Sequence, residues 1–522
     1  MEKSFGIVYS PRFSSSIVAM SADPSRDLAE KNVKAILEWL AMAHGRTSLD
    51  DVEGLLAQLQ SLRGTKVGVS QRLKVLDLLY SHAVHMTLAQ FPGLHEMSLP
   101  IPRRLRQAVR SLQELLEVLG QDYLATLSMP ADNDVGNRPR SPQITLRRIM
   151  HCLAWHLGIG FLVASPPAPG IWLQLHSCYR NSRRLGSSDQ AAGGEERRIA
   201  QLYVSTMLVA AAQPASFTSR ELEFISSYLD SSAKAVDIRI EAPPAGEAIF
   251  WIDPTKDLPA QALTRRSPPP ESEIYYFTCD TLAQSAADHL AALRRGATIS
   301  ELGLPPFAGT SAGQGVLQRL CALWGHPAKR KFSRRRQSYR ADLCNGLDRL
   351  WQLLRHPEQP PTTSEWMVIN ESPDGYSMMH VSGPTERLRV GDVVAVHPHE
   401  GHIDTDHGPW HICIVRWAIS ENPAHIEIGL QVLSPRGMPA QIAAPHDSDR
   451  QGKREALLLP KLPPLRPLPA LIVPVGTVTD RDQKLIVLVE TGNFEIREYR
   501  AMEVNEQTSS VEMFTVRPDE RL

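Results

Sequence analysis

Apolar residues recur every three to four positions from about residue 25 to residue 240, and this spacing predicts a long succession of helices. In the segment AEKNVKAILEWLAMA, for example, Val33, Ile36, Leu37 and Leu40 fall on one helical face. Further segments of the same type follow and pair into helical hairpins, although no strict repeat consensus links them. We therefore expect an all-α helical scaffold at residues 25–240, built as a helical repeat or a bundle.

The pattern changes at the proline pair 243–244. The segments AIFWID at 248–253 and EIYYFT at 273–278 alternate apolar and polar residues, as half-buried strands do. Two helical segments follow them and lead into a run of arginines. This order predicts a mixed α/β connector at residues 245–328.

Short strands separated by turn residues dominate the rest of the chain, and their spacing predicts a small antiparallel β-barrel at residues 329–440. A second set of strands at 450–522 either extends this barrel or forms a small domain of its own. The expected fold class is therefore multidomain α+β: an N-terminal all-α helical scaffold, a mixed connector, an antiparallel β-barrel and a small extra β region.

The charge of the whole chain attracts neither nucleic acid nor membrane, because 56 Lys and Arg residues nearly balance 57 Asp and Glu residues. The six cysteines form no CxxC pair, which is typical of single buried thiols in a reducing cytosol. The most apolar window, at 150–165, is shorter than a membrane span needs, and we expect it to form a buried helix. The N-terminus has no signal-peptide pattern. These features predict a cytoplasmic protein with no membrane span.

Two short motifs carry the candidate chemistry. The first is RRRQSYR, in which Arg334, Arg335, Arg336 and Arg340 supply guanidinium groups that match phosphates and the Hoogsteen edge of guanine. The second is NESPDG at 370–375, which offers an amide acceptor, a hydroxyl and a tight turn through glycine. Together the two motifs contain the groups that a bound guanine dinucleotide needs.

The pair resembles the signature of the PilZ domain family, which are bacterial receptors for cyclic di-GMP. That signature is RxxxR followed, after a short interval, by [D/N]xSxxG, and this sequence has Arg336-Gln-Ser-Tyr-Arg340 and Asn370-Glu-Ser372-Pro-Asp-Gly375. The strands downstream, to about residue 436, are similar to the later strands of that barrel. The resemblance implies a PilZ-like β-barrel that binds cyclic di-GMP.

The resemblance also implies a role for each matching residue. Arg336 and Arg340 would grip guanine edges and phosphates, Arg334 and Arg335 would add phosphate or stacking contacts, and the arginine stretch would be a flexible lead-in that folds around the ligand. The second motif would contribute Asn370 to a guanine edge, Ser372 to a phosphate or base, and Gly375 to the turn. Asn370 stands where the family often has Asp. The insert at 343–365 between the motifs is more helical than a simple strand and could cover the ligand or displace it.

Other candidate sites have simpler interpretations. The histidines of the segment 397–411, with Asp404 and Asp406, match no known zinc spacing, so no metal site is expected. The arginines at 103, 104, 106 and 110 are expected on a solvated helix face. No nucleotide-hydrolysis loop or nucleophile elbow occurs in the sequence, so no catalytic residue is assigned.

The function predicted from the sequence is thus a non-enzymatic receptor whose ligand is cyclic di-GMP, with no other cofactor. Binding would draw the arginine stretch onto the barrel and reorient the region 25–240, which would bind a protein partner. Two alternatives stay open. One is a PilZ-like scaffold without ligand, and the other is nucleic-acid binding through the basic run 329–340, which the neutral overall charge makes less favourable.

Overall fold

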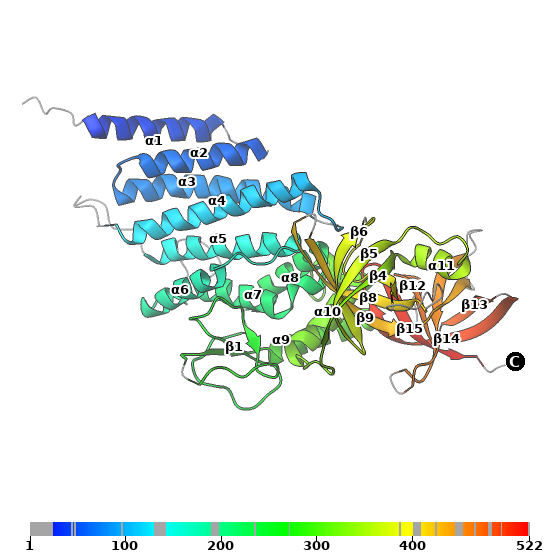
Figure 1. Ribbon diagram of the computed structural model, residues 1–522. Coiled ribbons are helices and arrows are strands. Elements are labelled where there is room, and N and C mark those ends of the chain that lie inside the picture. The colour runs from blue at the N-terminus through cyan, green and yellow to red at the C-terminus, as the bar shows by residue number, and fades with distance from the viewer. Residues whose placement is uncertain are drawn as a thin grey trace, which may run out of the picture.

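The computed structural model describes residues 24–519 except 43–44, 46–48, 95–97, 130–141, 189–197, 234–235, 271, 386–387, 400–408, 423–424, 444–452, 464–465, 479–482 and 492. A stack of helices forms one end of the molecule and two β-barrels form the other end (Figure 1). The expected α+β class, with helices first and barrels last, is confirmed.

The helical region is built from eight α-helices that lie side by side in sequence order (Figure 1). Their amphipathic faces bury a continuous apolar core. A capping box at Thr218 and Glu221 marks the start of the last helix. The helices are α1 Pro24–Met42, α2 Leu49–Gly64, α3 Val69–Gln90, α4 Arg103–Leu127, α5 Pro142–Leu162, α6 Ile171–Arg184, α7 Ile199–Ala211 and α8 Ser219–Ser232, with 3-10 turns at η1 Phe91–Leu94 and η2 Pro214–Ser216.

The connector contains a small antiparallel sheet in the order β2-β1-β3, followed by two helices. Both segments that were predicted as strands are strands, and they pair with each other. The elements are β1 Ile249–Ile252, β2 Gln261–Ala262, β3 Tyr275–Thr278, α9 Asp280–Arg294, η4 Pro306–Gly309, α10 Ser311–Leu320 and the π-helical turn η5 Cys321–Gly325.

The first barrel closes six antiparallel strands in the order β4-β5-β6-β9-β8-β7. Its strands are β4 Arg335–Asn345, β5 Ser364–Ser372, β6 Gly375–Ser382, β7 Val393–Pro398, β8 His411–Asn422 and β9 His425–Ser434. A short helix, α11 Leu347–Arg355, lies in the insert between β4 and β5, where a helical segment was predicted.

The strands of the small extra β region close with β10 into a second barrel, which begins at Met438 and so before the expected boundary at residue 450. Its order is β10-β11-β12-β15-β14-β13, so both barrels connect their six strands in the same way. Helix α11 packs against β10 and β11, and an apolar core cluster joins the two barrels. The strands are β10 Met438–Ala443, β11 Lys453–Leu459, β12 Ala470–Pro474, β13 Lys484–Thr491, β14 Asn493–Gln507 and β15 Val511–Pro518.

The helical region is fixed to the first barrel by a buried arginine. The Arg106 guanidinium, 5% exposed, donates to the Ser420 carbonyl at 2.8 Å, the Ser420 hydroxyl at 2.8 Å and the Glu421 carbonyl at 3.1 Å. The Ser420 N–H in turn donates to the Ala164 carbonyl at 2.8 Å. The expectation of a solvated face is therefore wrong for Arg106, because β8 covers that part of α4.

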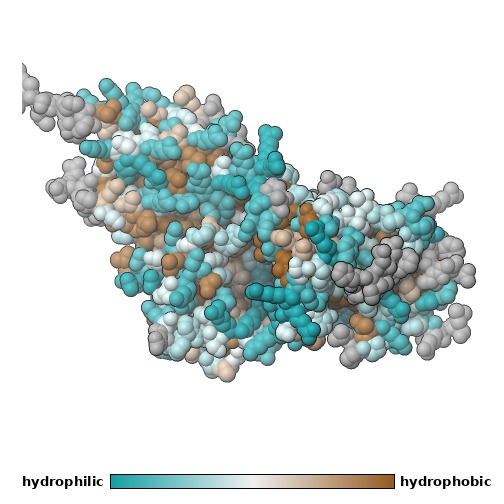
Figure 2. All heavy atoms as spheres, viewed as in Figure 1, coloured by the Kyte–Doolittle hydropathy of each residue, from teal (hydrophilic) through white to brown (hydrophobic). Residues whose placement is uncertain are grey.

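The surface in Figure 2 is mostly polar, with apolar residues gathered over the helical region and at its junction with the barrels. Within the part of the chain that the structure describes, no helix has both the length and the apolar character to cross a membrane.

Candidate functional site

The two motifs meet on adjacent antiparallel strands. The arginine motif begins β4, and the motif NESPDG ends β5 and begins β6. In the β4–β5 register Arg336 lies opposite Asn370, and Arg335 lies opposite Glu371. Cross-strand partners of this kind are within about 5.5 Å of each other. Residues more than thirty positions apart in the sequence therefore form one surface.

A β-bulge separates the two arginines of the RxxxR motif. The register shifts between Arg336 and Tyr339, which lie opposite Asn370 and Val368. Arg340 then lies opposite Met367, and side chains alternate between the two faces of a strand. Arg336 thus shares the face of its cross-strand partner Asn370, and Arg340 shares the outer face of Met367.

On the outer face Arg340 is already paired. Its guanidinium lies 2.7 Å from the Glu365 carboxylate, and the side chains are 45% and 34% exposed. A ligand that uses this arginine must compete with Glu365. Because the pair is largely in water, its cost to a ligand is small.

Glu371 connects the two motifs through side-chain hydrogen bonds. Its carboxylate accepts from the Gln337 amide at 2.7 Å and from the Tyr339 hydroxyl at 2.6 Å. Both donors lie inside the RxxxR motif, at positions that the motif leaves unspecified. Sequence reasoning missed all three residues, although each lies inside a quoted motif.

Asn370 presents an acceptor without a donor. Its Oδ1 is buried, and among the described residues no group donates a hydrogen bond to it. A buried polar atom without a partner is unfavourable, and such atoms are rare in folded proteins. A bound ligand with an N–H donor, such as the Watson–Crick edge of guanine, would satisfy it.

The hairpin between β5 and β6 holds its own residues in place. The Ser372 hydroxyl donates to the Asp374 carboxylate at 2.6 Å, and Ser372 pairs with Gly375 across the turn. A Cβ at Gly375 would collide with the carbonyl oxygen of Leu430 in β9. The glycine is therefore required by the close approach of two strands, in addition to any role in the turn.

Arg334 lies next to this hairpin. Burial lowers its pKa, the nearby Arg330 lowers it further, and Asp374 raises it. The arginine stretch was expected to be a flexible lead-in, but the chain is already a β-strand from Arg335 onward. Helix α11 of the insert packs between the two barrels, against β4 and β7 of the first and β10 and β11 of the second.

Part of the histidine-rich segment lies outside the described residues, including His402, Asp404, Asp406 and His407. Within the described ranges, no group of three or more potential metal ligands occurs. His399 instead pairs with Asp342, with 2.9 Å between Nε2 and Oδ2.

Comparison with known proteins now identifies the barrel. Residues 34–244 match the family model described as "Cyclic-di-GMP receptor FimW, N-terminal domain", and residues 352–439 match "Cyclic-di-GMP receptor FimW, middle PilZ domain". The chain is also similar to the cyclic-di-GMP receptor FimW of Pseudomonas aeruginosa, with 20% identity over 573 residues, covering 91% of each chain. No solved structure matches.

The resemblance to the PilZ family is therefore confirmed for the first barrel. Asn370, Ser372 and Gly375 lie inside the matched range, whereas the arginine motif precedes it. The pairing of β4 with β5 places the arginine motif beside the matched range.

Proposed function

We propose, from the PilZ domain that the chain carries, that this protein is a receptor for cyclic di-GMP and that the ligand binds across the start of β4 and the β5–β6 hairpin. One observation carries the proposal: Arg336 lies opposite Asn370, whose buried Oδ1 has no donor among the described residues. This arrangement puts a guanidinium fork and an unsatisfied acceptor on one face. Guanine and its phosphates offer the complementary groups.

The seven predicted site residues have different roles in this proposal. Arg334, Arg335 and Arg336 bind phosphates and the Hoogsteen edge, and Arg340 joins them after it leaves Glu365. Asn370 accepts from a guanine N–H. Ser372 contacts a phosphate or base, and Gly375 shapes the hairpin.

The chain then acts by binding and not by catalysis, in the cytoplasm, with the helical region as the output that binds a protein partner. The end of the connector, which leads into the arginine motif, is held to the segment after β2, because Thr264 and Arg265 donate to the carbonyls of Pro327 and Ala328 at 2.7 and 3.1 Å. Movement of the arginines upon binding would therefore act on the connector and on the helices beyond it. The size of the response is limited by the difference in ligand affinity between the two arrangements.

Calorimetric titration of the intact protein with cyclic di-GMP tests the proposal. We expect saturable binding that Arg336→Ala and Asn370→Ala each weaken at least tenfold, which corresponds to about 1.4 kcal/mol. The exposed Arg104 of α4 provides the matched control, and Arg104→Ala should bind like the parent protein. GTP should not compete.

Two other outcomes would replace the proposal. A flat titration of the folded parent protein would favour a PilZ-like scaffold without ligand. Binding of RNA or DNA that falls steeply with salt and shows no preference for guanine would favour nucleic-acid binding through 329–340.

A further inference from the structure

Helix α5 is buried along its length except for one open stripe. From Arg147 to Leu162 its partly exposed residues recur at the spacing of a single helical face, and the residues between them are buried. These stripe residues form the floor of a cavity of about 910 Å³. They are Arg147, Arg148, His151, Ala154, Trp155, Gly158, Phe161 and Leu162.

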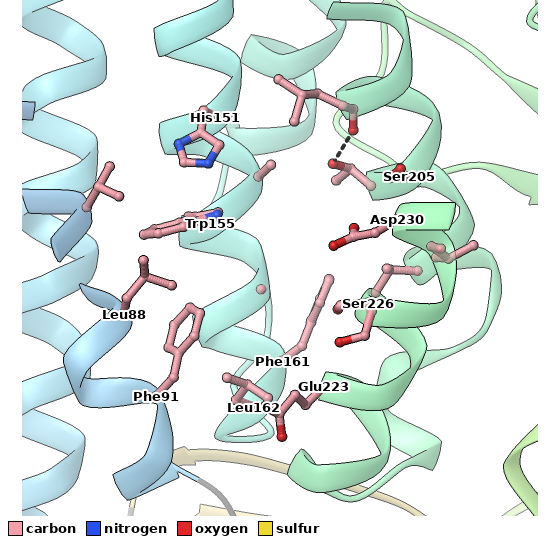
Figure 3. Close-up of a pocket in the computed structure, with 18 of the residues that line it drawn as sticks. Leu88, Phe91, His151, Trp155, Phe161, Leu162, Ser205, Glu223, Ser226 and Asp230 are labelled. Atoms are coloured by element: carbon pink, nitrogen blue, oxygen red, sulfur yellow. Dashed lines mark hydrogen bonds between the residues drawn. The ribbon is translucent and has the colours of Figure 1, made fainter. Parts of the chain in front are cut away.

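The cavity is a groove with unlike walls. On one side α3 contributes Leu88, which is 51% exposed, and Phe91 follows it. On the other side α8 contributes Glu223, Ser226 and Asp230 (Figure 3). A second cavity of about 590 Å³ lies between α1 and α3 and shares Ser81 with the first, so the two cavities adjoin each other at α3.

The charged side chains that line the groove also differ between its two walls. The groove-lining residues of α8 include two acids and no base. At the start of α5, the Arg148 guanidinium lies 4.2 Å from the centre of the Tyr80 ring and 4.0 Å from the Asp77 carboxylate, so its charge is directed toward α3. Arg147 also lines the cavity, so one further base stands against the two acids of α8. The wall at α8 therefore favours a cationic group in an occupant, whereas the floor at Trp155 and Phe161 favours an apolar one.

Gly158 keeps the floor open. It lies inside α5, where glycine is unfavourable for a helix, and a Cβ at this position would meet nothing within 4 Å. No described neighbour therefore requires a glycine for packing. By contrast, a Cβ at Gly315 of α10 would collide with the Gln507 carbonyl. The absent side chain at 158 leaves space between Trp155 and Phe161 in the groove itself.

We propose that this groove binds an amphipathic helix of a partner protein, with its apolar face on Leu88, Trp155 and Phe161 and its lysines or arginines toward Glu223 and Asp230. The floor from residue 147 to 162 accommodates about 15 residues of helix at about 1.5 Å per residue. The inference deepens the output role proposed above and rests on it, but binding in the groove does not require cyclic di-GMP.

Two synthetic peptides of about four helical turns test the inference by fluorescence polarisation with the full chain. Both carry the same leucine face, and one has lysines and the other glutamates beside it. We expect the lysine peptide to bind at least tenfold more tightly. Gly158→Trp should fill the floor and weaken that binding about tenfold, whereas Gly64→Trp on α2, another helical site with open space, should not.

Charge reversal gives the second test. The double variant Glu223→Lys, Asp230→Lys should reverse the preference and bind the glutamate peptide more tightly. Equal weak binding of both peptides, unchanged by Gly158→Trp, would overturn the proposal. So would binding that appears only after deletion of residues 1–23, because the chain's own N-terminal segment would then be the occupant.

Two controls separate the outcomes. If sedimentation shows that the protein self-associates and that Gly158→Trp abolishes this, a second copy is the occupant and the partner proposal fails. Gly158→Trp should leave the calorimetric titration with cyclic di-GMP unchanged. Failure of the groove and failure of the receptor proposal are therefore distinguishable.

Discussion

Glu371 is the side chain that holds the arginine motif against the second motif. Its carboxylate accepts from Gln337 and Tyr339, which lie between the motif arginines. We predict that Glu371→Ala weakens cyclic di-GMP binding about tenfold, since the loss of two charge-assisted hydrogen bonds, each about 1 kcal/mol or more, leaves the arginines less ordered. Calorimetric titration measures the change.

Glu365 provides the matched control on the same strand. It pairs with Arg340 at 2.7 Å, so Glu365→Ala removes a competitor for that arginine and should leave the affinity unchanged or higher. Equal weakening by both variants would show that Glu371 acts through the charge of the strand and not through its hydrogen bonds. In that case the ordering role of Glu371 would be wrong.

Asp392 is a buried carboxyl group where the two barrels meet. Its oxygens accept from the Ser510 hydroxyl at 2.5 Å and the Arg389 N–H at 2.8 Å. Burial raises the pKa of Asp392 to about 6, although both hydrogen bonds and the charge of Arg389 act in the opposite direction. The folded protein therefore binds a proton here more tightly than the unfolded chain, whose carboxyl titrates near 4.

This group makes the protein less stable as the pH rises. Below pH 4 the carboxyl is protonated in both states, and the free energy of unfolding falls as the pH rises from about 4 to about 6. We predict that Asp392→Asn gains about 2 kcal/mol over the parent protein between pH 4 and pH 7, by denaturant unfolding. An asparagine can still accept from Arg389 and donate to Ser510. A constant difference across this range would contradict the raised pKa.

At the scale of elements, the sequence predicts those helices and strands that hydrophobic periodicity and turn residues determine. The helices up to residue 240 and the strands β1 and β3 were predicted because their apolar faces repeat locally. Helix α5 was predicted as buried. Its open stripe was not, because beyond His151 the stripe is apolar, with Trp155 and Phe161, and so no polar face marks its exposure.

In the candidate site, too, local motifs were predicted and cross-strand partners were not. The residues of both motifs were found because each motif is continuous in the sequence. The bulge between Arg336 and Tyr339 was not predicted, because register depends on how β4 pairs with β5 and β7 at once. The partners Glu365 and Glu371 depend on that register, so they follow only from the structure.

At the scale of the molecule, closure of the second barrel could not be predicted from local sequence patterns. It requires β10 to pair with β13, which is more than forty residues away. Both barrels have the same strand order, but the loop of the second that corresponds to NESPDG is the proline-rich segment between β11 and β12. The proposed ligand residues thus belong to the first barrel alone. The second contributes the shared core under α11.

Arg106 was placed on a solvated face because its partners, Ser420 and Glu421, lie more than three hundred residues away in the sequence. It links the helical region to β8, and burial lowers its pKa, with Arg110 lowering it further. Any change that the ligand induces in the first barrel must reach the helices through contacts of this kind or through the connector. The junction is therefore where coupling is open to direct test.

We predict that Arg106→Ala uncouples the helical region from the barrels. The buried Ser420 carbonyl and the partly buried Glu421 carbonyl would lose their donor, at a cost of about 2–4 kcal/mol. Calorimetry should then resolve separate unfolding of the helical region, and cyclic di-GMP should raise the melting temperature of the barrels alone, whereas in the parent protein it should raise both. Arg110→Ala, at an exposed position one turn along α4, should behave like the parent. If Arg106→Ala kept a single ligand-shifted transition, coupling would run through the connector or through the other contacts between the helical region and the barrel, such as the bond from the Ser420 N–H to the Ala164 carbonyl.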